Sequence, residues 1–108
     1  MERIIRLLDE MGIKNEIDTN FALIEFWTDT AGQDIPVEID FDGTVSDLVN
    51  KYSDFAENYD VDDEVELYAN MRGTKGVPAT IRELLDDCQE AKDTLMDIAR
   101  KMQTVIKN

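Results

Sequence analysis

The sequence predicts an α+β fold, with a three-stranded antiparallel sheet, helices on one face and a long C-terminal helix. The runs Phe21–Thr28 and Ile35–Asp42 are rich in aromatic and β-branched residues or alternate in polarity, and they flank a polar turn. Together they predict a hairpin. Apolar residues at helical spacing predict three helices, the last of about 26 residues. With 108 residues, 43% of them hydrophobic, the chain suffices for one core, so residues 1–108 are expected to form a single domain.

The predicted helices have recognisable ends. Gly12 is placed to cap the first helix at its C-terminus. Thr44 with Asp47, and Thr80 with Glu83, have the spacing of capping boxes that open the second and third helices. The expected helical ranges are residues 2–11, 45–58 and 81–106.

A third strand is expected at Glu64–Met71, where apolar and polar residues alternate before a basic loop at residues 72–76. The element order is then α-β-β-α-β-α. A strand that leaves a hairpin through one helix runs antiparallel to the first strand. The expected sheet is therefore fully antiparallel, with order 2-1-3 when the strands are numbered along the chain.

Strand parity places carboxylates from all three strands on the sheet face away from the helices, among aromatic side chains. Two interpretations of this face are open. Acidic outer faces keep small domains soluble and discourage edge pairing. Alternatively, the face is a binding surface whose carboxylates imitate phosphates, with Trp and Tyr as anchors. The predicted partner-binding residues are Glu25, Trp27, Glu38, Asp40, Asp42, Glu64, Glu66 and Tyr68.

The negative charge is concentrated in one part of the chain. Between Asn15 and Glu66 there are sixteen acidic residues and a single base, Lys51, so this segment carries a formal charge of −15 in a chain of net charge −14. Such a field repels nucleic acid and anionic membranes and favours a basic protein surface. The expected partner is therefore a basic protein.

The local motif Asp40-Phe41-Asp42-Gly43-Thr44 resembles the Asp-x-Asp-Gly-Thr signature of the haloacid dehalogenase superfamily. The resemblance implies Asp40 as a nucleophile and Asp42 as a general acid, with Mg²⁺ at the phosphoryl group. That motif follows a buried parallel strand, whereas this strand carries Glu38 on its outer face. We therefore expect no enzyme here, but a turn in which Gly43 permits the bend and Thr44 caps a helix.

Other chemical signals are sparse. The chain has no histidine, which excludes histidine-based catalysis and histidine metal sites. Its one cysteine, Cys88, lies on the apolar stripe of the last helix and is expected in the core, in a reducing compartment. No run approaches the roughly 20 apolar residues of a membrane span. We expect a cytoplasmic protein with no cofactor and no metal.

The last helix carries apolar residues at a and d spacing over nearly four heptads. At 1.5 Å per residue it is about 39 Å long, more than a three-stranded sheet covers. One interpretation is a single helix that spans the sheet. The other is a homodimer through its overhanging second half, at Leu95, Ile98, Met102 and Val105.

Three segments taken together resemble small acidic proteins of phages and conjugative elements of Firmicutes. They are Asp42–Thr44, Asp60–Leu67 and Gly76–Leu85, and the resemblance extends over about Phe21 to Met102. Some such proteins of mobile elements are anti-CRISPR or anti-restriction inhibitors, and several of these mimic DNA. The resemblance implies an inhibitor of a CRISPR or restriction nuclease that does not itself bind nucleic acid. The alternative is a dimeric interaction module whose acidity serves solubility.

Overall fold

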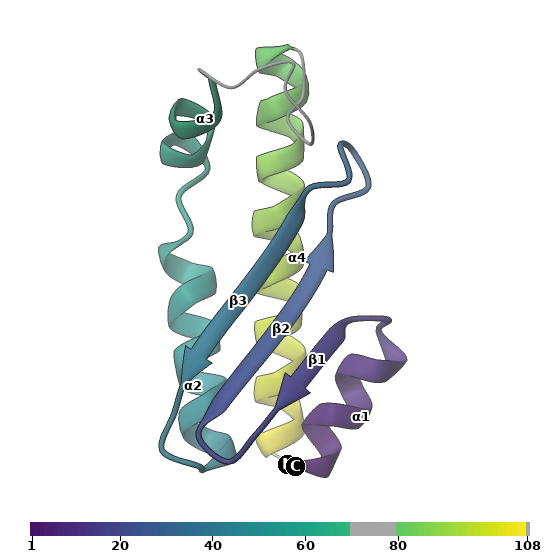
Figure 1. Ribbon diagram of the computed structural model, residues 1–108, viewed down its shortest axis with the longest axis vertical. Coiled ribbons are helices and arrows are strands. Elements are labelled where there is room, and N and C mark those ends of the chain that lie inside the picture. Colours follow the sequence, from purple (N-terminus) through teal and green to yellow (C-terminus); the bar gives the residue numbers. More distant parts are fainter. Residues whose placement is uncertain (70–79, 108) are drawn as a thin grey trace.

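The computed structural model describes residues 1–69 and 80–107, with residues 68 and 69 as backbone only. It is elongated, about 42 × 23 × 22 Å, with one sheet lying against a long helix (Figure 1). The elements follow in the order α1 (Glu2–Glu10), β1 (Lys14–Ile17), β2 (Phe21–Trp27), β3 (Asp34–Asp40), α2 (Val45–Asn58), α3 (Val61–Ala69) and α4 (Ile81–Lys107).

The sheet is antiparallel throughout, in the order β1-β2-β3. The predicted hairpin is confirmed, because β2 pairs with β3 from Phe21 opposite Asp40 to Trp27 opposite Asp34. On the other side of β2, Glu25 lies opposite Lys14. Helices α1, α2 and α4 pack on one face, and in the described part of the chain no helix covers the other.

The expected strand order 2-1-3 is wrong, because the third strand is β1 and not Glu64–Met71. β1 has four residues, of which only Ile17 is apolar, so its composition gives little strand signal. A turn joins it to β2, in which the Asp18 N–H donates to the Phe21 carbonyl at 2.8 Å. β1 occupies the place beside β2 where the later segment was expected.

The segment expected as the third strand begins within a helix, α3. The Asp60 carboxylate accepts hydrogen bonds from the N–H groups of Asp62, at 2.9 Å, and Asp63, at 3.2 Å, and so caps the helix. Acidic residues fill the first turn, where the helix dipole favours them. Glu64, Glu66 and Tyr68 therefore lie on α3 and not on the sheet. Met71 and the basic loop lie outside the described residues.

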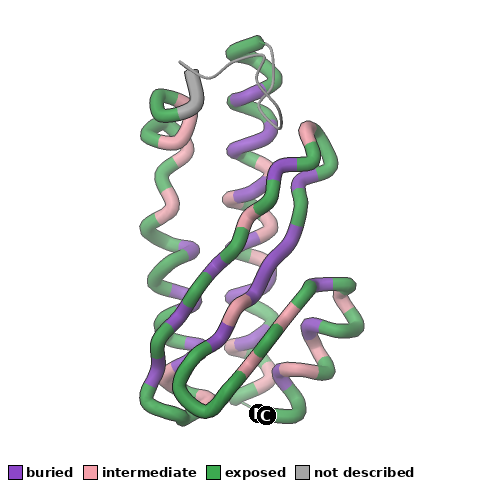
Figure 2. Tube along the Cα trace, in the orientation of Figure 1, coloured by how far each residue is buried: buried purple, intermediate pink, exposed green. Residues whose placement is uncertain are grey.

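The main core lies between the inner sheet face and the C-terminal half of α4 (Figure 2). Leu95, Ile98 and Met102 are fully buried there, and Val105 is partly buried against the same core. Within the single chain, α1 and α2 contact α4, and the buried residues of this half join one core cluster with residues of the sheet. The second half of α4 therefore does not overhang the domain as expected, and a homodimer through these four residues stays a prediction.

It is the N-terminal half of α4 that extends past the sheet, and α3 packs against it (Figure 1). Leu84, Cys88 and Ala91 are buried there. The predicted burial of Cys88 is confirmed, and burial raises the pKa of its thiol. α4 has 27 residues, about 40 Å at 1.5 Å per residue, and different elements pack against its two halves.

The predicted helix ends are also confirmed. Gly12 follows α1 with a φ of 73°, and Gly43 bends the chain after β3 with a φ of 97°. The Thr44 hydroxyl accepts from the Asp47 N–H at 3.1 Å, and the Thr80 hydroxyl accepts from the Glu83 N–H at 3.1 Å. These caps fix where α2 and α4 begin.

Candidate protein-binding surface

The sheet face that points away from the helices is the most distinctive surface of the molecule, and we call it the outer sheet face. Its members follow from the alternating burial along each strand and from the register between strands. Five of them are carboxylates and one is a base. They are Lys14 and Glu16 of β1, Phe21, Leu23, Glu25 and Trp27 of β2, and Asp34, Pro36, Glu38 and Asp40 of β3.

Apolar side chains run along the middle of this face. Trp27 is 53% exposed and Phe21 is 37% exposed, one at each end of β2, with the partly buried Leu23 between them. A lone exposed apolar residue is ordinary, but several on one open face flanked by charge are typical of an interaction surface. Trp is among the residues that most often dominate binding energy.

Glu25 is the central charged residue of the outer sheet face. It is only 8% exposed, and its Oε1 lies 3.4 Å from the Lys14 ammonium. On its other side lie Pro36, directly opposite, and Asp34. A hydrogen bond with Glu25 raises the pKa of Asp34, slight desolvation and the negative charge of Glu25 raise it further, and the Lys14 ammonium opposes the shift. Asp34 therefore retains its proton to a higher pH than an ordinary aspartate does.

The edge of the sheet at β3 is protected against strand addition. The Thr28 N–H donates to the Gln33 carbonyl at 2.9 Å, and the Phe41 N–H donates to the Asn20 carbonyl at 3.0 Å. Hydrogen-bonded and non-hydrogen-bonded pairs alternate along an antiparallel ladder, and these two bonds fix which pairs are which. The backbone N–H and C=O groups that point outward from the sheet edge are therefore those of Asp34, Pro36, Glu38 and Asp40. Pro36 has no N–H to offer, and the Lys51 ammonium donates to the Asp40 carbonyl at 3.0 Å. A partner therefore has better access to the face than to this edge.

Asp42 lies in the turn after β3 and serves the cap of α2. Its Oδ1 accepts from the Thr44 N–H at 2.8 Å and from the Thr44 hydroxyl at 2.6 Å. The Thr44 hydroxyl bond lowers the pKa of the Asp42 carboxyl. Asp40, two residues earlier, lies on the outer sheet face. The two carboxylates of the Asp-x-Asp motif therefore have different structural surroundings.

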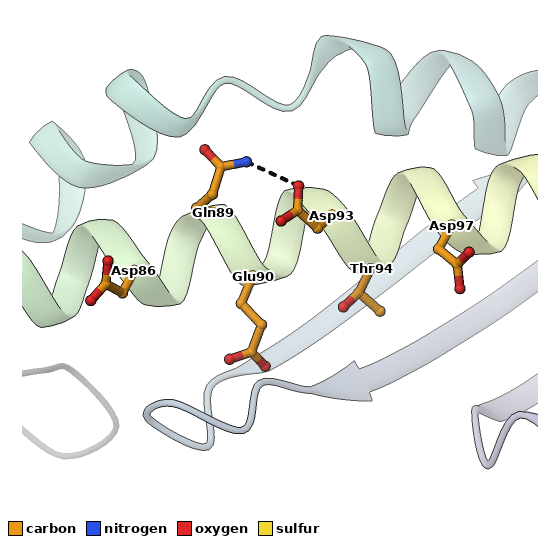
Figure 3. Close-up of a pocket in the computed structure, with 6 residues that line it drawn as sticks. All are labelled: Asp86, Gln89, Glu90, Asp93, Thr94 and Asp97. Atoms are coloured by element: carbon orange, nitrogen blue, oxygen red, sulfur yellow. Dashed lines mark hydrogen bonds between the residues drawn. The ribbon is translucent and has the colours of Figure 1, made fainter.

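A second acidic surface is a shallow groove on α4, lined by Asp86, Gln89, Glu90, Asp93, Thr94 and Asp97 (Figure 3). Much of its charge is used within the protein. Asp97 lies 2.5 Å from the Arg100 guanidinium and 3.0 Å from the Lys101 ammonium, and the Lys101 contact foremost lowers its pKa. Glu90 points to the β2–β3 turn and binds it. The groove thus offers a partner less free charge than the outer sheet face.

The structure brings together four of the predicted partner-binding residues, Glu25, Trp27, Glu38 and Asp40. Asp42 lies beside them in the cap, and the other three are on α3. Parity along β2 also places Phe21 and Leu23 on this face, and sequence reasoning missed four further members. They could have been found from the pairing of the short polar strand β1 with β2, and from a start of β3 one residue before the predicted run. They are Lys14, Glu16, Asp34 and Pro36.

Within the described ranges, no three acidic or cysteine side chains come together as a metal site. None of the helices in the described part of the chain has the length and apolar composition of a membrane span. Comparison with known proteins gives no significant match to a protein-family model, a curated protein or a solved structure.

Proposed function

We propose that the protein is an inhibitor that binds a basic, nucleic-acid-binding nuclease of host defence, of the CRISPR or restriction type, and occupies the groove that otherwise holds nucleic acid. The observation that carries this proposal is the open outer sheet face, on which Trp27, 53% exposed, lies among five carboxylates. No catalytic step is assigned to the chain.

The charge of the outer sheet face supports a partner of this kind. A nucleic-acid groove is lined with Lys and Arg that neutralise phosphates and release counterions. Carboxylates from three adjacent strands present the same sign of charge over a continuous area, as Glu16, Glu25 and Glu38 do. Such a field speeds the encounter with a basic surface and repels nucleic acid.

The aromatic residues favour binding over solubility as the role of this face. Acidic residues alone account for solubility. Solubility does not account for Trp27 and Phe21, because exposed aromatic rings oppose it. The apolar seam of α4 lies in the core of the single chain, which gives less support to the alternative of a dimeric module.

Affinity capture with matched variants tests the proposal. The bait is the wild type, the outer-face variant Glu38→Lys/Asp40→Lys, or the control Asp86→Lys/Asp93→Lys, which makes the same charge change on α4. We expect a nucleic-acid-binding protein on the wild-type and control baits and its loss from the outer-face variant. Duplex DNA or guide RNA should displace it. A partner held equally by all three baits, or indifferent to nucleic acid, would exclude this function.

A further inference from the structure

We propose that Trp27, Glu25 and Asp34 form a seat for an arginine guanidinium of the basic partner. The inference rests on the proposed function, because it names the chemical group by which that partner is anchored. Its basis is the juxtaposition, on one open face, of the most exposed aromatic ring of the outer sheet face and its most enclosed carboxylate.

The register brings these three side chains together. Trp27 and Asp34 are direct cross-strand neighbours, and Glu25 lies two residues before Trp27 on the same face. Thr28 and Gln33, the next pair along the ladder, are joined by a backbone hydrogen bond. Because such pairs alternate with pairs that lack backbone bonds, Trp27 and Asp34 form a pair of the second kind. Side chains approach each other more closely in such pairs, at about 4.5–5.5 Å between Cβ atoms.

Among the described residues, the charged groups that face this seat are Glu25 of β2, Asp34 of β3 and Lys14 of β1. With both carboxyls ionised, the set carries one negative charge in excess, since Lys14 compensates only one of them. A cation of a partner would remove that excess. An incoming cation beside Trp27 also gains from the negative face of the indole ring.

Guanidinium fits this arrangement better than ammonium. It is planar, so it stacks on a flat ring, and its five N–H donors diverge toward two acceptors at once. Glu25 and Asp34 are two such acceptors on neighbouring strands. An ammonium already occupies the β1 side of Glu25, at Lys14, which leaves the Asp34 side for the partner.

The seat predicts that binding is coupled to release of a proton. Glu25 raises the pKa of Asp34 in the free protein, so Asp34 retains its proton to a higher pH than an ordinary aspartate. A guanidinium favours the ionised form, so its arrival lowers that pKa. The affinity for guanidinium should therefore decline as the pH falls through the raised pKa of Asp34.

Trp27 is the only tryptophan of the chain, so its fluorescence reports on the seat alone. The probe is an acetylated and amidated triarginine peptide at low salt, and the control peptide carries citrulline, which has the same shape without the charge. We expect saturable quenching by triarginine, a weaker response to trilysine and none to citrulline. Asp34→Asn and Glu25→Gln should each weaken the affinity by at least about fivefold, whereas Asp93→Asn on α4 should not.

The outcomes separate the seat from the proposed function. Equal binding of the arginine and citrulline peptides, or an affinity unchanged in both Asp34→Asn and Glu25→Gln, would overturn the seat. The citrulline comparison needs no variant, so it stands even where a substitution disturbs the fold. If the captured nuclease were still lost from Glu38→Lys/Asp40→Lys, the proposed function would survive that result. Conversely, the result could be that triarginine binds as predicted while DNA fails to displace the captured partner. That result would refute the proposed function and leave the seat standing.

Discussion

The Thr30 hydroxyl, in the turn between β2 and β3, donates a hydrogen bond of 2.7 Å to the Glu90 carboxylate on α4. The Thr30 N–H donates to the same oxygen at 3.0 Å, and the Asp29 N–H donates to the other oxygen. One residue further on, the Ala31 N–H donates to the buried Asp87 at 3.1 Å. Two carboxylates of the long helix thus hold the tip of the hairpin.

This clamp has a consequence for the binding surface. The turn connects Trp27 to Asp34, the cross-strand pair at the end of the outer sheet face. Backbone N–H groups in a turn are otherwise left to water, and here each has a fixed acceptor. The clamp therefore orients the strand ends that carry the proposed arginine seat.

Glu90→Gln should reduce the free energy of unfolding by about 1 kcal/mol. The amide retains the shape but replaces an oxygen acceptor by an NH₂ group that faces backbone donors. The exposure of the turn keeps the effect small. Urea denaturation measures it, with Asp86→Asn on the same helix as the control, for which we expect a change within about 0.5 kcal/mol. Equal losses in both variants would indicate a general effect of helix charge.

The same clamp should weaken in acid. Burial opposes ionisation of Glu90, but the hydrogen bonds from Thr30 and Asp29 outweigh it and lower its pKa. A lowered pKa in the folded state adds stability above the unfolded value of about 4.3, and this stability is lost as the pH falls through the folded pKa. The difference in stability between the wild type and Glu90→Gln should therefore shrink below about pH 4. A difference that stays constant as the pH falls below that value would contradict the assignment.

Leu95→Ala should cost about 2–5 kcal/mol, because Leu95 is fully buried in the main core and its truncation leaves a cavity. If the core belongs to one chain, the thermal midpoint should not depend on protein concentration. Thermal denaturation over a hundredfold range of concentration tests this for the wild type and the variant. A midpoint that rises with concentration would restore a dimer as the unit that folds.

Sequence patterns predicted those elements in which local and long-range preferences agree. The hairpin of β2 and β3 combines alternation with turn residues, and α2 and α4 combine apolar spacing with capping boxes at Thr44 and Thr80. They failed where the pattern was ambiguous. In Val61–Ala69, every second residue from Val65 onward is apolar, which is the pattern of a strand. Val61, Val65 and Ala69 are also four residues apart, which is the spacing of a helix face, so a half-buried helix produced the polarity pattern of a strand. β1 forms a strand because it pairs with β2, whereas its own composition gives little strand signal.

Removing the cap of α3 tests the corrected element. Asp60→Ala should cost about 1 kcal/mol, because the N–H groups of Asp62 and Asp63 lose their acceptor. Leu67→Ser should change stability by less than about 0.5 kcal/mol, since Leu67 is 61% exposed. A strand with Leu67 facing the core would give the reverse ranking. Chemical denaturation of the two variants distinguishes these cases.

The two aspartates of the Asp-x-Asp motif should respond differently to amide substitution. Asp42→Asn should lower stability, because the ionised carboxylate accepts two hydrogen bonds from Thr44. Asp40→Asn should leave stability unchanged, since Asp40 is exposed on the outer sheet face. We expect no Mg²⁺-dependent hydrolysis of p-nitrophenyl phosphate by the wild type. Turnover that disappears in Asp40→Asn would instead make the dehalogenase resemblance functional.

About half of the predicted binding residues could be placed on one surface from the sequence, because parity along β2 and β3 is a local property. Glu25 and Trp27 lie on the outer sheet face for that reason, as do Glu38 and Asp40. Of the rest, Asp42 lies in the cap of α2, and the other three were placed on the sheet because helix α3 had been predicted as a strand. The contact with Glu25 that raises the pKa of Asp34 follows from cross-strand register and was likewise invisible in the sequence.

The last prediction concerns how the outer sheet face binds its partner. Exposed charges are screened beyond about 10 Å at 0.1 M salt, so the association rate with a basic partner should fall steeply as salt is added. Glu38→Lys/Asp40→Lys should slow association, because these two carboxylates are exposed and contribute to steering. Trp27→Ala should mainly speed dissociation, since a buried aromatic anchor acts after the encounter.

Surface plasmon resonance with the captured nuclease measures both rates, with Asp86→Lys/Asp93→Lys as the control of equal charge change on α4. We expect this control to slow association less than the outer-face variant does, because the groove on α4 lies away from the proposed contact and shares the long-range field only. An unchanged dissociation rate for Trp27→Ala would show that Trp27 does not anchor the complex. Equal slowing by both charge variants would show that net charge steers the encounter without a defined face, and would leave the aromatic residues to define the contact.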